Sequence, residues 1–309
     1  GSAVTGFSEI NKQVNNIMDI NYELYKVFYY VAKTLSFSEA SKQLYISQSA
    51  VSQSIKSLET KLNQHLFIRS TKKVKLTPEG EMLFKHVEPA VNLIIRGENQ
   101  ILDANTLNGG QLRIGASDTI CRYFLIPYLE EFHAHFPNVH IKVTNQTSAR
   151  CVDLLDNGQV DLIVANYPNP RMNTVSNVRQ VKEFKDIFIA NSHHFSYLKD
   201  KTLRLEELLA YPILMLDKQS MTSEFLHSLF QQKQLDLVPE IELSSNDLLI
   251  DLARIGLGIA FVPDFCLPEN DPDLFCIQTT DILPSRHIVV GYNDQVPISE
   301  AAKYFIESL

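Results

Sequence analysis

The chain has 309 residues, enough for roughly two domains, and its 45% hydrophobic and 21% charged residues are typical of a folded globular protein. Runs of 18 or more apolar residues are absent, so the sequence offers no candidate membrane-spanning helix. The first residues lack the basic start and apolar core of a secretory signal, and we expect a cytoplasmic protein. Gly1-Ser2 looks like a scar of tag removal and Met18 is a candidate natural start, so residues 1–18 are set aside as an N-terminal extension.

Charge is unevenly distributed along the chain. Residues 20–80 contain nine lysines or arginines and four acids, a net charge of +5, so the remainder of a chain whose total is −8 carries −13. A basic head on an acidic body is expected when one domain meets phosphate groups. The distribution therefore favours a nucleic-acid-binding N-terminal domain, although the net charge alone argues against one.

Three short helices are predicted in this basic head. An apolar stripe at helical spacing indicates a first helix from about residue 20 to 35. Ser38 is expected to cap a second helix that ends at Tyr45-Ile46, and Ser47 to cap a third. Two helices joined by a turn of three or four residues form a helix-turn-helix. The apolar stripes are Leu24, Val27, Phe28, Val31 and Leu35 in the first helix, and Val51, Ile55, Leu58 and Leu62 in the third.

The polar face of the third helix indicates DNA recognition. Short hydroxyl and amide side chains in the N-terminal half of a helix reach base edges in a major groove, and lysine holds phosphate. Residues 66–77 then form two strand-like runs around a basic tip, as in a hairpin wing. A solvated helix face and an ordinary hairpin are the alternatives. The exposed polar residues of the helix are Gln48, Ser49, Ser52, Gln53 and Lys56; the cations of the hairpin are Arg69, Lys72, Lys73 and Lys75.

About sixty residues of this head resemble the signature of LysR-type transcriptional regulators. The resemblance rests on residues 37–44, 47–59, Leu62, Leu66-Phe67, Arg69 and 76–80. Asn63 departs from the glycine usual in the family, but Asn also tolerates the left-handed conformation required there. The resemblance implies a winged helix-turn-helix over residues 19–77. It further implies base reading by Gln48, Ser49, Ser52 and Gln53, and phosphate contacts from Lys56, Arg69, Lys72 and Lys73.

A long linker helix is expected over residues 78–106. Thr77 caps it, Pro78 suits its first position, and Pro89 should kink it. An apolar stripe along about 25 residues is too long to be buried in so small a head, so a partner helix from a second chain, and hence a dimer, is expected; packing on the chain's own C-terminal domain is the alternative. The stripe is Leu83, Val87, Val91, Ile94 and Ile101.

Residues 111–309 alternate strand and helix patterns, which indicates an α/β domain with a parallel sheet. The segments 153–164 and 256–263 again resemble the effector domain of LysR-type regulators. That resemblance implies a fold like a periplasmic solute-binding protein, with subdomain one at 111–182 and 285–309 and subdomain two at 183–284. It also implies a tetramer of two dimers on bent DNA, whose geometry changes when a small-molecule effector binds.

An effector is expected in the cleft outside the carboxyl ends of the strands, where helix starts present free N–H groups. Hydroxyls and N–H groups suit a carboxylate or phosphate, with Arg122 and Arg150 nearby; each Ser or Thr can equally be a plain N-cap. The carboxylate of Asp118 repels an anion unless it is paired, or it binds an amine, and an amino acid would fit both facts. The expected lining is Ser117, Asp118, Thr119, Thr147, Ser148, Asn166, Met221 and Thr222, with Ile259 and Phe261 on the opposite wall.

Catalytic and metal-binding motifs are not evident, so we expect a non-enzyme without a cofactor or metal. Two alternatives remain: a redox-sensing regulator of the same fold, and a solute-binding protein without a regulatory role. The winged head argues against the second. The first would use the four widely spaced cysteines, which lack metal-ligand spacing and are otherwise expected to be reduced, partly buried thiols. They are Cys121, Cys151, Cys266 and Cys276.

Overall fold

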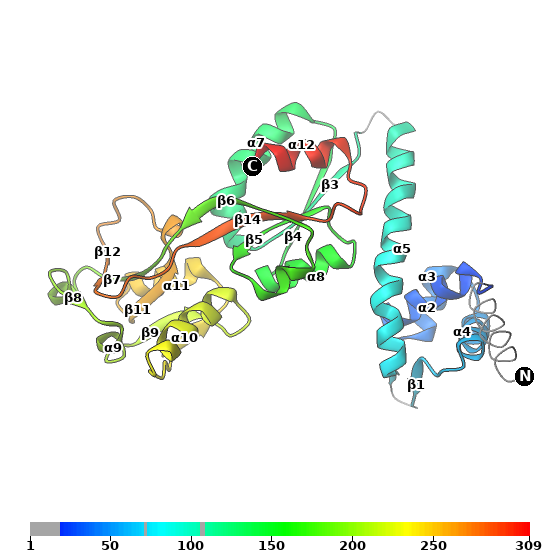
Figure 1. Ribbon diagram of the computed structural model, residues 1–309, viewed down its shortest axis with the longest axis horizontal. Coiled ribbons are helices and arrows are strands. Elements are labelled where there is room, and N and C mark those ends of the chain that lie inside the picture. The colour runs from blue at the N-terminus through cyan, green and yellow to red at the C-terminus, as the bar shows by residue number, and fades with distance from the viewer. Residues whose placement is uncertain (1–18, 71–72, 106–108) are drawn as a thin grey trace, which may run out of the picture. The chain divides into compact units, whose positions relative to one another are not determined.

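The computed structural model describes residues 19–70, 73–105 and 109–309 (Figure 1). It divides into two compact units, residues 1–98 and residues 99–309. Within the described ranges, none of the helices has the length and apolar character needed to cross a membrane.

The first unit begins with the predicted three helices, α2 (Tyr22–Thr34), α3 (Phe37–Leu44) and α4 (Gln48–Leu62). They are followed by an antiparallel hairpin of β1 (Phe67–Arg69) and β2 (Val74–Leu76), which is the predicted wing. Their apolar faces form one core, in which Phe28, Val51, Ile55 and Leu58 are fully buried. Burial of each such side chain contributes roughly 1.5–3 kcal/mol, so the core fixes the orientation of α4.

The caps of these helices follow the sequence with one exception. Ser47 caps α4 as predicted, because its Oγ accepts from the N–H of Ala50 at 3.1 Å. Asn63 adopts the left-handed conformation expected of it, with φ 52°. The prediction that Ser38 caps the second helix is wrong. Ser36 takes that role, with extended backbone and an Oγ that accepts from the N–H of Glu39, so Ser38 lies inside the first turn.

A 28-residue helix, α5 (Pro78–Asn105), follows the wing and runs through Pro89. Thr77 caps it as predicted, accepting from the N–H of Gly80 at 3.0 Å. Gly80 lies against the backbone of Leu66, where a Cβ atom would meet the carbonyl oxygen at 2.1 Å.

The apolar stripe of α5 divides into two parts. Val87 and Val91 are buried in the core of the head, so the head covers the N-terminal part of a stripe that it was expected to be too small to bury. Ile94 and Ile101 remain 43% and 67% exposed. Among the described residues of the stripe, the exposed ones thus lie in the C-terminal half of α5.

Residues 99–309 contain two five-stranded sheets. The first has the order β4-β3-β5-β14-β6 and includes the predicted parallel βαβαβ unit. Its strands are β3 (Gln111–Ala116), β4 (His140–Asn145), β5 (Leu162–Tyr167), β6 (Asn177–Phe184) and β14 (Arg286–Tyr292), and its helices are α7 (Ile126–His135), α8 (Ser148–Asp156) and α12 (Glu300–Ser308). The helix expected at 122–136 begins earlier, with α6 (Asp118–Ile120) and a π-helical turn at Cys121–Leu125 preceding α7.

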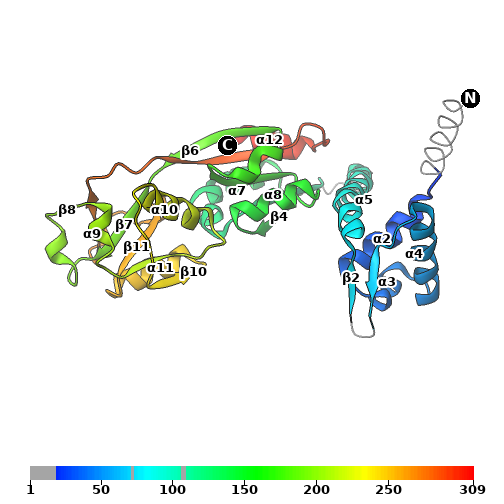
Figure 2. The same cartoon turned by 60° about the horizontal axis from the view of Figure 1, so that its bottom comes forward.

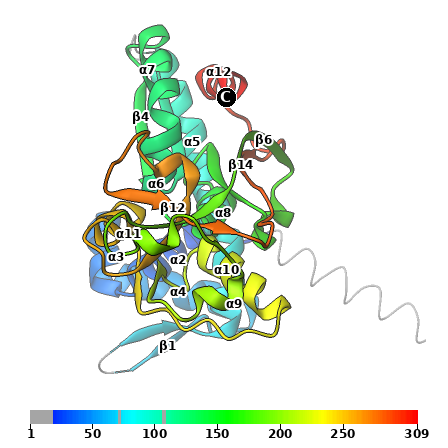
Figure 3. The same cartoon turned by 90° about the vertical axis from the view of Figure 1, so that its left-hand side faces the viewer.

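The second sheet has the order β10-β9-β11-β7-β12. One face packs on α9 and α10 and the other on α11, and Figure 3 shows α10 and α11 on different sides. A small parallel pair of β8 (Thr202–Leu203) and β13 (Gln278–Thr279) lies apart from it. The remaining elements are β7 (Asp186–Asn191), β9 (Ile213–Leu216), β10 (Ile241–Leu243), β11 (Ile259–Pro263), β12 (Leu274–Cys276), α9 (Leu205–Leu208), α10 (Met221–Gln232) and α11 (Asn246–Arg254), with short 3-10 turns at Pro170–Thr174, Ser196–Leu198 and Asp264–Cys266.

Two neighbouring segments carry the chain between the sheets. The outward crossing lies between Phe184, the end of β6, and Asp186, the start of β7; the return enters β14 at Arg286. β6 and β14 pair side by side, as Figure 2 shows, so both crossings leave the first sheet together. This is the two-strand connection implied by the resemblance, with β6 running two residues beyond the boundary expected at 182.

Candidate DNA-binding surface and effector pocket

The outer face of α4 carries the predicted base-reading residues. Gln48, Ser49 and Gln53 are exposed and Ser52 is half-buried, while Val51 on the opposite face is fully buried. Ser49 makes a side-chain hydrogen bond with Ser47 at 3.0 Å. The polar groups thus lie along the N-terminal half of the helix, where a major groove admits them.

The expected phosphate contacts lie on α4 and on the wing. Lys56 and Lys73 are exposed. The guanidinium of Arg69 is exposed and stacks on the ring of Phe37, 4.3 Å from its centroid. This contact fixes the base of the wing to α3. Lys72 lies outside the described residues.

Tyr45 is a surface feature that the sequence analysis did not assign to DNA. It is 95% exposed and takes a left-handed conformation, φ 56°, at the end of α3, just before α4. An aromatic residue in this conformation is rare, and an exposed hydroxyl beside a recognition helix suits a backbone phosphate. An aromatic residue in the short turn before the recognition helix was the signal that could have identified it.

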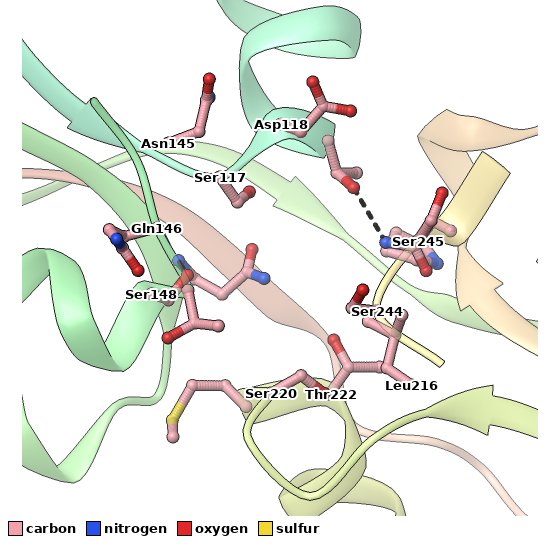
Figure 4. A pocket seen from close by; sticks show the side chains of 16 residues that line it. Ser117, Asp118, Asn145, Gln146, Ser148, Leu216, Ser220, Thr222, Ser244 and Ser245 are labelled. Atoms are coloured by element: carbon pink, nitrogen blue, oxygen red, sulfur yellow. Dashed lines mark hydrogen bonds between the residues drawn. The ribbon is translucent and has the colours of Figure 1, made fainter. Parts of the chain in front are cut away.

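A pocket of about 300 Å³ lies in the effector domain, at the carboxyl ends of strands from both sheets. Figure 4 shows side chains from several elements around it, among them Ser117, Ser148 and Thr222. Eight of the ten predicted effector residues line this effector pocket. They are Ser117, Asp118, Thr119, Thr147, Ser148, Asn166, Met221 and Thr222.

Four N-caps converge on the effector pocket. Each accepts a hydrogen bond from the backbone N–H of the third residue in the following helix; the four are Ser117, Thr147, Ser220 and Ser245. These residues are therefore N-caps that also line the pocket. The helices α8, α10 and α11 have nine, twelve and nine residues, so their N-termini add partial positive charge at the pocket.

Among the described lining residues, Asp118 alone carries a charged side chain. Its carboxylate lies 4.0 Å from the guanidinium of Arg122, which in turn lies 3.2 Å from Asp247 of α11. Asp118 thus has a cation from the following π-helical turn at the limit of ion-pair distance. Arg150 is exposed and does not line the pocket.

Two predicted residues do not line the effector pocket. Ile259 and Phe261 are fully buried and pack in the core beneath α10. Side chains of β11 alternate between the two faces of the sheet, and the pocket lies at the end of that strand, where Pro263 contacts it instead. The wall from α11 was missed, although the Ser-Ser-Asn run before a helical pattern was the signal for it. The other lining residues are Asn145, Gln146, Leu216, Ser220, Ser244, Ser245 and Asn246.

All four cysteines are free thiols. Burial raises the pKa of Cys121 to about 11 and that of Cys151 to about 12, and it also raises the pKa of Cys266 and Cys276. Reactive cysteines require a lowered pKa, so the four environments are unlike those of a thiol sensor. The described residues contain no group of histidine, cysteine or acidic side chains arranged for a metal ion.

A winged helix-turn-helix joined to a two-subdomain ligand-binding domain defines a class of DNA-binding transcriptional regulators. Family models agree with this description: residues 22–81 match the bacterial regulatory helix-turn-helix protein, LysR family, and residues 105–309 match the LysR substrate binding domain. The chain belongs to the LysR family of transcriptional regulators, as its sequence predicted.

Several relatives cover most of the chain. A probable RuBisCO transcriptional regulator of Gracilaria tenuistipitata var. liui is 31% identical over 75% of this chain and 76% of the relative. The transcriptional activator CmpR of a Synechocystis species is 26% identical over 92% of this chain and 93% of the relative.

Solved structures share the fold at lower identity. The full-length regulator CbnR, complexed with its target DNA, is 19% identical with a TM-score of 0.62, covering 93% of this chain and 98% of that one. The CcmR regulatory domain of Synechocystis, in complex with 2-PG, is 20% identical with a TM-score of 0.58, covering 64% of this chain and 95% of that one.

Proposed function

We propose that this regulator responds to a small hydroxyl-bearing anion, a carboxylate or phosphate, that binds in the effector pocket. The observation that carries the proposal is the direction of the hydrogen bonds made by seven hydroxyl groups around the pocket. Each accepts a hydrogen bond from an N–H group of the protein, and none donates to another described residue. They are Ser117, Thr119, Thr147, Ser148, Ser220, Thr222 and Ser245.

Because a hydroxyl has a single hydrogen, each of these groups keeps its donor for a ligand. A pocket rich in donors, with helix N-termini beside them, favours negative charge without a lysine or arginine in its lining. Two buried acceptors complement the donors: the Oδ1 atoms of Asn166 and Asn246 have no partner among the described residues. A hydroxyl on the ligand satisfies such an acceptor.

An amino acid is the second candidate ligand. Asp118 supports it, since a carboxylate attracts an ammonium group. The ion pair of Asp118 with Arg122 weakens that attraction, and the unpaired amide oxygens accept from a hydroxyl as well as from an amine. The CcmR regulatory domain, which shares this fold, was solved in complex with 2-PG, and this supports the first candidate.

For DNA, we propose that α4 enters the major groove with Gln48, Ser49, Ser52 and Gln53 at base edges. Lys56, Arg69, Lys72 and Lys73 then hold the backbone. Two chains pair through the exposed part of the α5 stripe, and two such dimers form the tetramer, so that each DNA site meets two heads. A ligand that favours one arrangement of the effector domains shifts DNA binding by its differential affinity for that arrangement.

The experiment is a ligand titration of the full chain by thermal unfolding and calorimetry. The probes are 2-PG, glycolate, glycine, acetate and the neutral amide glycolamide. A ligand at 100 times its dissociation constant adds about 2.7 kcal/mol to the free energy of unfolding. We expect 2-PG and glycolate to bind more tightly than acetate and glycine, and glycolamide to bind weakest.

A matched pair of capping variants localises the binding. Ser220→Ala removes a cap at the pocket and Ser299→Ala removes the cap of α12 outside it; each lost cap costs about 1 kcal/mol of stability. We expect only Ser220→Ala to weaken ligand binding. Equal affinities in the two variants, or stabilisation by glycine alone, would contradict the proposal of an anion in this pocket.

A further inference from the structure

Arg286, the first residue of β14, is the largest fully buried side chain among the described residues and does not line the effector pocket. Its guanidinium forms a bidentate pair with Asp186, with Nε and Nη2 each 2.7 Å from a carboxylate oxygen. The rings of Phe184 and Phe225 lie 5.0 and 4.9 Å from the guanidinium carbon. The group is therefore fixed in position and closed off from solvent.

The same guanidinium reaches the pocket through one contact. Nη2 donates to Oγ1 of Thr222 at 3.0 Å, and Thr222 lines the pocket near the start of α10. A guanidinium has no acceptor, so Oγ1 must accept this bond. The hydroxyl hydrogen of Thr222 must then point elsewhere, and no other described residue accepts it.

The contact also joins the two subdomains. Arg286 begins a strand of the first sheet, whereas Asp186 and Thr222 belong to the second subdomain. Thr222 is 3% exposed, so its hydroxyl cannot turn freely toward water. The remaining nitrogen of the guanidinium, Nη1, has no hydrogen-bond partner among the described residues.

From this geometry we propose that Arg286 is a positioning residue for effector selection. By holding Thr222 as a hydrogen-bond donor toward the pocket, it favours an anion over a neutral ligand of the same shape. The inference rests on the proposed effector function and adds a specificity-determining residue that the pocket lining does not include. In this proposal Thr222 contacts the ligand, and Arg286 makes the Thr222 hydroxyl a donor toward the pocket.

A double-mutant cycle tests the link, with 2-PG, glycolate and glycolamide titrated into the full chain. Thr222→Val, which lacks the hydroxyl, should weaken 2-PG and glycolate roughly ten- to hundred-fold and change glycolamide little. Thr222→Ser should bind like the parent protein. Arg286→Lys should weaken 2-PG in the parent but add at most about two-fold in the Thr222→Val background, because the two residues act on one contact.

Controls separate positioning from support of the fold. Arg254→Lys alters another arginine–carboxylate pair, that of Arg254 with Asp271 at 2.9 Å, and should lower stability without changing ligand affinity. An equal effect of Arg286→Lys in both backgrounds would overturn the proposal. If Arg286→Lys does not fold, Thr222→Ser and Thr222→Val provide the test. An equal loss of ligand affinity in both would show that the hydroxyl has no role and would overturn the proposal.

The two proposals can fail separately. If Arg286→Lys keeps the preference of the parent protein for glycolate over glycolamide, the proposed function stands and the role of Arg286 is overturned. Absence of binding by every probe overturns both.

Discussion

At the scale of single residues, Cys121 gives the sharpest test of a redox role. Burial raises its pKa to about 11, so it stays a thiol at neutral pH, and its reactivity should rise about tenfold per pH unit up to that value. We expect iodoacetamide at pH 8 to modify the exposed Cys276 first, and peroxide to leave DNA affinity unchanged. Peptide mass mapping with a Cys276→Ser control measures this, and labelling of Cys121 as fast as free cysteine would restore the redox alternative.

The raised pKa of Cys121 also has a consequence for stability. In the unfolded chain this thiol ionises near its ordinary value of 9, whereas in the folded protein it ionises only near 11. Ionisation between these values favours the unfolded chain. The contribution of Cys121 to the free energy of unfolding is therefore complete below pH 9 and falls as the pH rises toward 11.

At the scale of elements, the exposed part of α5 should mediate pairing of two chains. Ile101 is 67% exposed, and burying such a side chain in a partner helix contributes roughly 1.5–3 kcal/mol. We expect Ile101→Glu to weaken self-association at least tenfold and to lower DNA affinity with it. Light scattering on size-exclusion fractions measures the change. Gln100→Glu places the same charge on a neighbouring face of the helix and should leave association unchanged; similar loss in both variants would argue against the stripe.

The elements also show what local sequence can and cannot determine. Caps at Ser47 and Thr77 and the left-handed Asn63 were predictable because each depends on a few adjacent residues. The lining residues at the helix starts were predictable as well, because a helix that follows a strand begins at the carboxyl end of that strand. Ile259 and Phe261 were misplaced because their surroundings depend on which face of a strand meets α10, a property of packing between distant segments. Arg286 could not have been assigned, since its partners lie 64 and 100 residues away.

At the scale of the whole molecule, the charge distribution allows attraction to the DNA backbone to be distinguished from recognition of its bases. The head carries +5 and the rest of the chain −13, so attraction to the phosphate backbone is confined to the first eighty residues. Attraction of this kind releases counterions and depends steeply on salt, whereas contacts to base edges do not. The exposed residues Lys56 and Gln53 lie three positions apart on α4, which makes them a matched pair for separating the two effects.

Removing one phosphate contact should reduce the slope of log affinity against log salt by about 0.9 for each head bound. We therefore expect Lys56→Ala to lower both affinity and slope, for specific and random DNA alike. Gln53→Ala should lower affinity only for the specific site, by about 1–3 kcal/mol, with an unchanged slope. Fluorescence anisotropy at several KCl concentrations, on a duplex enriched from a random library, measures both quantities. If Gln53→Ala changed the slope and Lys56→Ala did not, the roles of the two residues on α4 would be reversed, and the recognition helix would lie in the groove turned about its axis from the orientation proposed.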